Sequence, residues 1–366
     1  MNFGQALPEE RWIKLVRHAY DRGIRTFMTA DVFGAGAADE MLGRALAGLP
    51  RASYCLVGAV GHDFYKGQRQ GARGYPRFTD PALRPPRDYH GYLRMATEKS
   101  LERCRAQKFD LLLLHNPDST GYGSERVWLA MDKIREEKLA DRLGIAPGPA
   151  NGFTLDLILC WERFGPLLDW AMIILNPLEP WPGRLVLPAA VKHDIHLVTR
   201  VVDYGGLFHD DVRAGHEFPA QDHRSFRPAG WVEAGREKMD QMRPIAEKHN
   251  LTMLQLACLW TLAQPSVKSV VPTLIQEAGT DSRTIESKAD DLAALPEIKF
   301  SEEEVELMAR VGENQGCMTL KGANRSHTGL AEPDRWGLTA DLEAVGRRWG
   351  INPDQDLICT HQDVAR

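Results

Sequence analysis

Several features are scarce or missing in this 366-residue sequence, and each absence excludes a class of protein. No apolar run approaches the ~18 to 20 residues that a membrane-spanning helix needs. The first residues, MNFGQALPEERW, lack the apolar core of a secretory signal. The six cysteines form no CxxC pair, which argues against a disulfide framework and a zinc ribbon. We therefore expect a cytoplasmic protein with reduced thiols.

The sequence also lacks a run of basic residues long enough to bind the backbone of a nucleic acid. Its 45 lysines and arginines are outweighed by 50 aspartates and glutamates, which gives a formal net charge of -5. We expect neither a nucleic-acid nor a membrane partner, and a small molecule remains as the expected ligand. The pattern leaves open whether the chain forms a homo-oligomer.

Short apolar runs alternate with amphipathic stretches along most of the chain. The runs that predict strands lie at residues 25–30, 54–61, 109–116, 141–147, 170–177, 196–204 and 267–274. The clearest helical patterns cover residues 9–23, 88–108, 124–138 and 253–264. This alternation predicts parallel strands covered by helices. Because no GxGxxG follows a first strand, it favours an α/β fold of the (β/α)8 barrel type over a doubly wound sheet.

Three segments exceed the usual length of a connection between a strand and a helix. Residues 62–92 and 205–231 each follow a predicted strand, so we expect both to overhang the barrel mouth, where such loops build active sites. The third is the tail, which contains the helical pattern TADLEAVGRRWG. We predict a barrel over residues 1–315 and an extension over 316–366 that packs on it, either as a lid or as a peripheral element.

Four segments together resemble motifs of the aldo-keto reductase superfamily. They are RGIRTFMTADVFGAGAADEMLGRAL, SLERCRAQKFDLLLLHNPD, MDKIREEKLADRLGIAP and LACLWTLAQPSVKSVVP. The resemblance runs to about residue 311 and implies the TIM barrel of that family. The opening MNFG is similar to the segment that follows the family's first strand. The resemblance thus implies a barrel whose first strand is missing or shortened.

The resemblance implies a catalytic tetrad, and here it is degenerate. In the family, NADPH supplies a hydride to a carbonyl and a tyrosine supplies the proton, helped by a lysine, an aspartate and a histidine. By position these residues are Phe33, Ala59, Met28 and His115, so only the histidine is retained. General acid assistance contributes ~10² to 10⁴ in rate. We therefore expect ordinary carbonyl reduction to be very slow.

The resemblance also implies a nucleotide site with unusual residues. Thr273 replaces the glycine of the family's I-P-G loop, and acidic residues oppose phosphate binding nearby. Candidate contacts to NADP(H) are Asn176 at the nicotinamide amide, Arg200 at the stacking position, and Arg283 and Lys288 at the 2′-phosphate. The alternatives are solvated loop charges and a barrel that binds no such cofactor.

Four residues are candidates for replacement chemistry. His115 ends a predicted strand and should face the mouth, and His62 directly follows another strand. Arg200 has the planar guanidinium suited to a carboxylate or phosphate, and Tyr204 is a further proton donor. No HExxH or paired CxxC spacing is present, so we predict no metal site.

Three functions remain open on these observations. The first is an aldo-keto-reductase-like enzyme acting on a small polar substrate of carbonyl type, anionic or sugar-like, by non-redox chemistry of the lyase, isomerase or hydrolase type. The second is an NAD(P)H-dependent oxidoreductase with a relocated proton donor. The third is a non-enzymatic barrel that binds a nucleotide or a partner. The sequence leaves the substrate identity undetermined.

Overall fold

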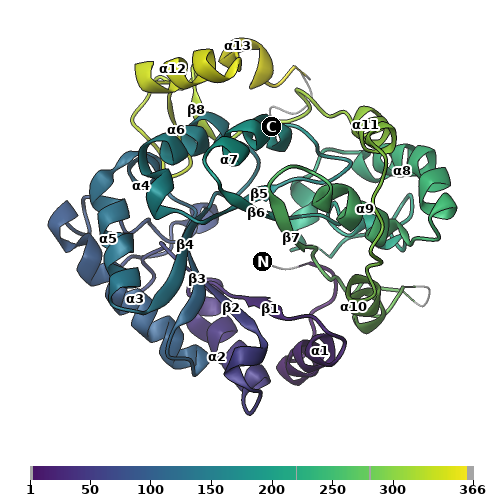
Figure 1. Ribbon diagram of the computed structural model, residues 1–366, viewed down its shortest axis with the longest axis horizontal. Coiled ribbons are helices and arrows are strands. Elements are labelled where there is room, and N and C mark those ends of the chain that lie inside the picture. Colours follow the sequence, from purple (N-terminus) through teal and green to yellow (C-terminus); the bar gives the residue numbers. More distant parts are fainter. Residues whose placement is uncertain (1–2, 220, 280–281, 361–366) are drawn as a thin grey trace.

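The computed structural model describes residues 3–219, 221–279 and 282–360, and its centre is a curled parallel sheet (Figure 1). The seven strands pair in chain order. They are β1 (Thr26–Met28), β2 (Cys55–Val60), β3 (Phe109–His115), β4 (Ala140–Ala146), β5 (Trp170–Ile174), β6 (His196–Arg200) and β7 (Val267–Val271). All seven predicted strands are present, and the barrel-type α/β fold is confirmed.

Helices surround the outer face of the sheet (Figure 1). In the barrel they are α1 (Glu9–Asp21), α2 (Ala37–Leu46), α3 (Tyr89–Cys104), α4 (Ser119–Gly123), α5 (Glu125–Glu136), α6 (Thr154–Phe164), α7 (Leu187–Lys192), α8 (Trp231–Lys248), α9 (Met253–Leu262), α10 (Ile285–Ala293) and α11 (Glu302–Val311). The tail adds α12 (Ala340–Trp349) and α13 (Pro353–Asp356). None of these helices in the described part of the chain is long and apolar enough to span a membrane.

Alternate residues of each strand face opposite sides of the sheet, as the twofold period of a strand requires. Leu112 and Leu114 of β3 belong to the large core beneath the helices. Leu111 and Leu113 belong to a smaller apolar cluster with Ala59, which fills the interior of the barrel. Both faces of the sheet are therefore apolar, and polar chemistry is confined to the strand ends.

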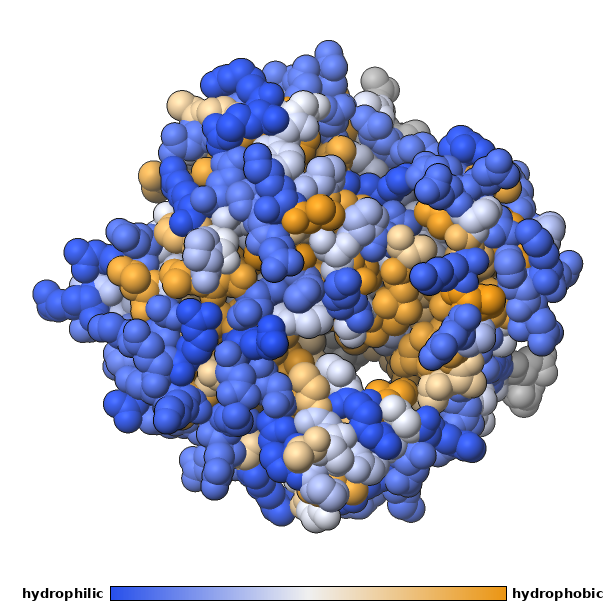
Figure 2. Space-filling model, viewed as in Figure 1, coloured by the Kyte–Doolittle hydropathy of each residue, from blue (hydrophilic) through white to orange (hydrophobic). Residues whose placement is uncertain are grey.

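The sheet does not close into a complete barrel within the described residues. There β1 pairs only with β2, and β7 pairs only with β6. The amino-terminal segment lies near the loop after β7, where Gln5 N donates to Gln276 O at 2.8 Å. Figure 2 shows an opening near the centre, bordered by apolar side chains, where Figure 1 has the space between β1 and β7. This arrangement agrees with the prediction of a barrel that lacks its first strand.

The tail packs on the barrel beside α6. Its short strands β8 (Gly322–Asn324) and β9 (Arg335–Gly337) pair with each other. Lys321 N donates to Asn151 O at 2.9 Å, and Phe153 N donates to Lys321 O at 3.0 Å. A Cβ at Gly152 would lie 2.2 Å from Lys321 O, so the approach of the two backbones requires glycine there. The extension is thereby joined to a loop at the barrel mouth.

Candidate active site at the barrel mouth

Two histidines meet where neighbouring strands end. His115 is the last residue of β3, and His62 follows β2 by two residues. Parallel strands present their carboxyl ends at the same rim, so both side chains belong to the mouth. A Cβ at Gly61 would lie 2.5 Å from His115 O, and the glycine therefore permits this close approach. The imidazole centroids are 5.1 Å apart, with the rings at 67°.

Apolar side chains occupy the three other positions of the family tetrad. The ring of Phe33 meets His115 edge to face, with centroids 5.6 Å apart. Ala59 is 4% exposed and packs in the interior cluster, with Met28 against its side. A phenyl ring, a methyl group and a thioether supply neither an acidic proton nor a charge. Phe33 thus lies against His115, and none of the three positions supplies a proton donor.

Arg77, which the sequence analysis did not single out, lies against His62. The two residues form an isolated antiparallel bridge, and Arg77 Nη1 is 3.1 Å from His62 Nδ1. The Arg77 Nε donates to the carbonyl of Asn116, and the Asn116 amide nitrogen is 3.2 Å from His62 Nε2. His62 Nδ1 is also 3.1 Å from Tyr75 O, so it faces both an acceptor and the donating guanidinium, whereas Nε2 faces the donating amide nitrogen.

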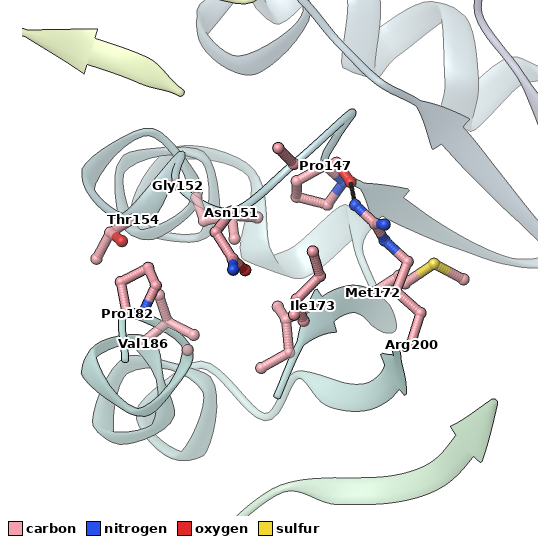
Figure 3. Close-up of a pocket in the computed structure, with 13 residues that line it drawn as sticks. Pro147, Asn151, Gly152, Thr154, Met172, Ile173, Pro182, Val186 and Arg200 are labelled. Carbon is pink, nitrogen blue, oxygen red and sulfur yellow. Dashed lines mark hydrogen bonds between the residues drawn. The ribbon is translucent and has the colours of Figure 1, made fainter. Parts of the chain in front are cut away.

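Arg200, at the end of β6, borders a cavity at the mouth (Figure 3). Its Nη2 donates to Pro147 O at 3.2 Å, the contact drawn in Figure 3. The space opens to solvent and is also lined by Asn151 and Gly152, from the loop that holds the extension. Its enclosed part is about 20 Å³, which is room for about one water molecule.

The electrostatics of the mouth keep both histidines neutral. Burial lowers the pKa of His115 well below its usual value, and His62, Arg77 and Arg200 lower it further. Burial, followed by the charge of Arg77, lowers the pKa of His62 to about 3. The buried Nδ1 of His115 has no hydrogen-bond partner among the residues that the structure describes. The mouth therefore combines two neutral imidazoles with two guanidinium groups.

Two predicted site residues have their polar atoms engaged elsewhere. Tyr204 packs edge to face on Trp231, with Arg227 4.1 Å over its ring, and burial raises its pKa to about 12. The Asn176 amide nitrogen donates to Glu179 Oε2 and to Val201 O, both at 3.0 Å. Asn176 thus fixes the turn after β5, and neither side chain has a described contact with His115.

The predicted phosphate contacts are paired with acids. Arg283 Nη2 is 2.9 Å from Asp291 Oδ2. The buried Lys288 Nζ is 2.7 Å from Asp211 Oδ2 and donates to Ile275 O at 2.6 Å. A cation already paired with a carboxylate offers little to a phosphate. The cations as they stand do not fit the phosphates of NADP(H), and their role in cofactor binding stays a prediction.

Sequence reasoning missed Arg77 and Asn116, and the signals for them were weak. Asn116 directly follows His115 in the strand-ending LLLLHN pattern. Arg77 lies within residues 62–92, which the sequence predicts to overhang the mouth, but nothing in the sequence brings it to His62. Across the described residues, no group of three or more histidines, cysteines, aspartates or glutamates is arranged to hold a metal ion.

Comparisons with known proteins identify the family and the fold of this chain. The model of the aldo/keto reductase family matches residues 1–313. The versiconal hemiacetal acetate reductase of Aspergillus parasiticus is 23% identical over 328 residues, which cover 83% of this chain and 88% of that protein. The glycerol dehydrogenase structure from Gluconobacter oxydans has a TM-score of 0.66 at 21% identity, covering 84% and 86% of the two chains.

A second solved structure has the same fold. It is an aldo/keto reductase from Klebsiella pneumoniae in complex with NADP and acetate, with a TM-score of 0.56 at 18% identity, covering 83% of this chain and 85% of that one. A family model that spans most of the sequence, on a sheet of the matching topology, shows that this chain belongs to the aldo/keto reductase family.

Proposed function

We propose that the chain is an aldo/keto reductase family enzyme that moves protons rather than hydride on a small polar substrate with a carbonyl group. The observation that carries this proposal is the pair of neutral histidines beside Phe33, where the family has a phenol. An imidazole that is neutral near pH 7 accepts a proton in general base catalysis. A phenyl ring cannot protonate an alkoxide.

The reaction class follows from the groups at the mouth. His115 removes a proton from the carbon next to the substrate carbonyl, and the C–H electron pair passes into an enolate. The positive charge of Arg200 and Arg77 at the mouth favours the negative charge that develops on the carbonyl oxygen. The protonated imidazole then returns its proton to the neighbouring carbon, which gives isomerisation, or to a leaving group, which gives elimination. No oxidant or reductant is consumed.

A nucleotide-dependent reductase is the second candidate, and one observation favours it. The related Klebsiella pneumoniae structure contains NADP. When bound, that cofactor would supply a hydride. In this chain Arg283 and Lys288 would first have to exchange Asp211 and Asp291 for phosphate. His115 would then hold the proton for the reduced carbonyl.

Isotope exchange separates the two candidates. The protein is incubated in D₂O with hydroxyaldehydes, ketoses and 2-keto acids without nucleotide, and deuterium at the carbon next to the carbonyl is followed by NMR. We expect exchange or isomerisation that His115→Ala abolishes. His196→Ala is the matched control, because His196 begins β6 at the opposite end of the barrel and packs on Trp170.

Two results would contradict the proposed proton transfer. Tight NADPH binding by fluorescence titration, with turnover of the same panel and no exchange in its absence, would support the reductase. An equal loss of exchange in His115→Ala and His196→Ala would remove His115 as the central residue.

A further inference from the structure

Arg77 and Arg200 differ from the other enclosed cations of this protein. Arg77 is 6% exposed, and neither Arg77 nor Arg200 has a carboxylate within 4 Å in the described part of the chain. Elsewhere, buried cations have such partners. Arg84 pairs with Asp63, Arg224 with Asp222 and Glu277, and Lys288 with Asp211.

Protein oxygen atoms satisfy these two guanidinium groups only in part. A guanidinium has five N–H donors. Arg77 donates to the carbonyls of Asn116 and Tyr75, and Arg200 donates to that of Pro147. Carbonyl oxygens carry no net charge, so neither cation has an opposite charge in direct contact within the described residues. Enclosing such a charge is costly unless an anion accompanies it.

The acids near the two arginines are engaged elsewhere. Asp118 accepts from Thr79 at 2.6 Å and from Gly121 at 2.8 Å, and Asp334 of the extension is 2.7 Å from Lys321. These two carboxylates raise the pKa of Arg77, but burial outweighs them and lowers it.

Glu179 is the acid near Arg200, and it too is engaged by other residues. It accepts from Asn176 at 3.0 Å and lies 3.6 Å from Arg227. Its charge raises the pKa of Arg200, but burial is the larger effect and lowers that pKa to about 10. Positive charge therefore predominates on the side of the mouth where Arg200 lines the cavity.

Both arginines act on the same two side chains. Their charges lower the pKa of His115 and oppose the rise that burial causes in the pKa of Tyr122. The buried Tyr122 hydroxyl has no hydrogen-bond partner in the described residues, so it is a further donor. Arg77 donates to Asn116 O and Arg200 to Pro147 O, and these residues directly follow the paired residues His115 and Ala146 of β3 and β4. An anion held by both arginines would therefore lie at the ends of these two strands, beside His115.

We propose that Arg77 and Arg200 together hold a doubly charged oxyanion of a small ligand, a dicarboxylate or a phosphate group, and that its binding is accompanied by proton uptake by His62 and His115. Burial is the larger cause of the low pKa of both imidazoles, and the arginine charges add to it. The anion offsets the arginine charges and so raises the pKa of both imidazoles. The inference rests on the proposed function for the catalytic use of this proton, whereas the binding itself does not depend on it.

Calorimetry tests the inference without turnover. Malonate, inorganic phosphate and acetate are titrated into the whole protein at pH 7, in two buffers with different heats of ionisation. We expect a dianion to bind at least tenfold more tightly than acetate, with uptake of up to about one proton. Binding of malonate alone identifies a dicarboxylate ligand, and binding of phosphate alone identifies a phosphate ligand.

Matched substitutions assign the binding to the two arginines. Arg77→Gln and Arg200→Gln should each weaken binding at least tenfold, while Arg87→Gln, at a side chain that is 82% exposed, should leave it unchanged. The NMR titration of the His115 ring in the unaltered protein needs no variant. Its protonation should move to higher pH when the dianion is added.

Three results would overturn the inference. They are no dianion binding at millimolar concentration, equal binding in both arginine variants, and binding without proton uptake or any change in the His115 titration. Failure here is distinct from failure of the proposed function. A protein that catalyses exchange without binding a dianion loses only this inference, and one that binds the dianion without exchange loses only the proposed reaction.

Discussion

The indole Nε1 of Trp336 donates a 2.8 Å hydrogen bond to Oδ1 of Asp156. Asp156 lies in α6 of the barrel, and Trp336 lies in β9 of the extension, 180 residues later. The other oxygen, Oδ2, accepts from the backbone of Ala323 at 3.3 Å. One buried carboxyl thus joins both short strands of the extension to the barrel.

Attachment of the extension should depend on pH through this carboxyl. Burial raises the pKa of Asp156 from 3.8 to about 6, against the hydrogen bonds from Trp336 and Ala323. A pKa raised by folding contributes stability that is complete below 3.8 and is lost as the pH rises through about 6. We expect stronger protection of residues 320–338 from hydrogen exchange at pH 5 than at pH 8.

The variant Asp156→Asn is the control for this effect, because its amide oxygen can still accept from Trp336 while it carries no charge. Its extension should show the same protection at both pH values once intrinsic exchange rates are corrected. Asp203, whose pKa burial also raises to about 6, contributes to global stability but does not touch the extension. Protection that does not change with pH in the unaltered protein would contradict the prediction.

Gly152 provides a separate test of how the extension is held. It has φ +129° and faces Lys321 O at a distance that excludes a Cβ. We expect Gly152→Ala to lower the free energy of unfolding by about 1 to 3 kcal/mol, because strain and a steric clash add. Chemical denaturation measures the loss, and hydrogen exchange should locate it in residues 320–338.

Gly91→Ala is the matched substitution. Gly91 lies within α3, and a Cβ there meets nothing within 4 Å. Within a helix, alanine is more favourable than glycine by about 0.5 to 1 kcal/mol. This variant should therefore be more stable than the parent. If both alanine variants lose stability equally, the contact with Lys321 does not explain the need for glycine.

The sequence was most informative where periodicity and family pattern agree. The continuous apolar run in FDLLLLH correctly predicted β3, because a strand with two covered faces is almost entirely apolar. The polar residue His115 follows this apolar run and was therefore correctly placed at the end of β3. The strand ends were overestimated after Arg200, where Val201 has φ +61° and the backbone leaves the sheet. No local pattern predicted that turn.

Contacts of charged side chains between segments that are far apart in the sequence could not be predicted. Lys288 of α10 and Asp211 of the loop after β6 are far apart in sequence, and their contact depends on how that irregular loop packs against the helix. Arg77 had the same difficulty, since its place beside His62 arises from the isolated bridge inside residues 62–92. Spacing rules apply to pairs of residues within one helix or one strand, and neither contact joins such a pair.

Replacing Arg200 should show that its charge lowers the stability of the folded protein. We expect Arg200→Met to raise the free energy of unfolding by on the order of 1 kcal/mol, because a half-buried charge without an acidic partner is exchanged for an apolar chain. Chemical denaturation without added anions is the measurement. Millimolar malonate or phosphate should narrow the difference by stabilising only the parent.

Arg224→Met is the comparison at a paired site. It would leave Asp222 and Glu277 as buried carboxylates without their guanidinium, and we expect a loss of about 3 to 5 kcal/mol. Opposite signs for the two variants would separate a binding arginine from a structural one. A similar loss in both would mean that Arg200 stabilises the fold.

Restoring the family's tetrad tests how far the site has diverged. Phe33→Tyr places a phenol near His115, but its pKa stays near ~10 without a neighbouring ammonium. The triple variant Met28→Asp, Phe33→Tyr and Ala59→Lys adds that ammonium and its carboxylate within the apolar interior cluster. We expect neither variant to oxidise NADPH with aldehydes, because Arg283 and Lys288 remain paired with acids. Loss of absorbance at the nicotinamide band measures turnover, and circular dichroism checks the fold. NADPH oxidation by the folded triple variant would mean that the nucleotide site is intact and that only the proton donor was lost.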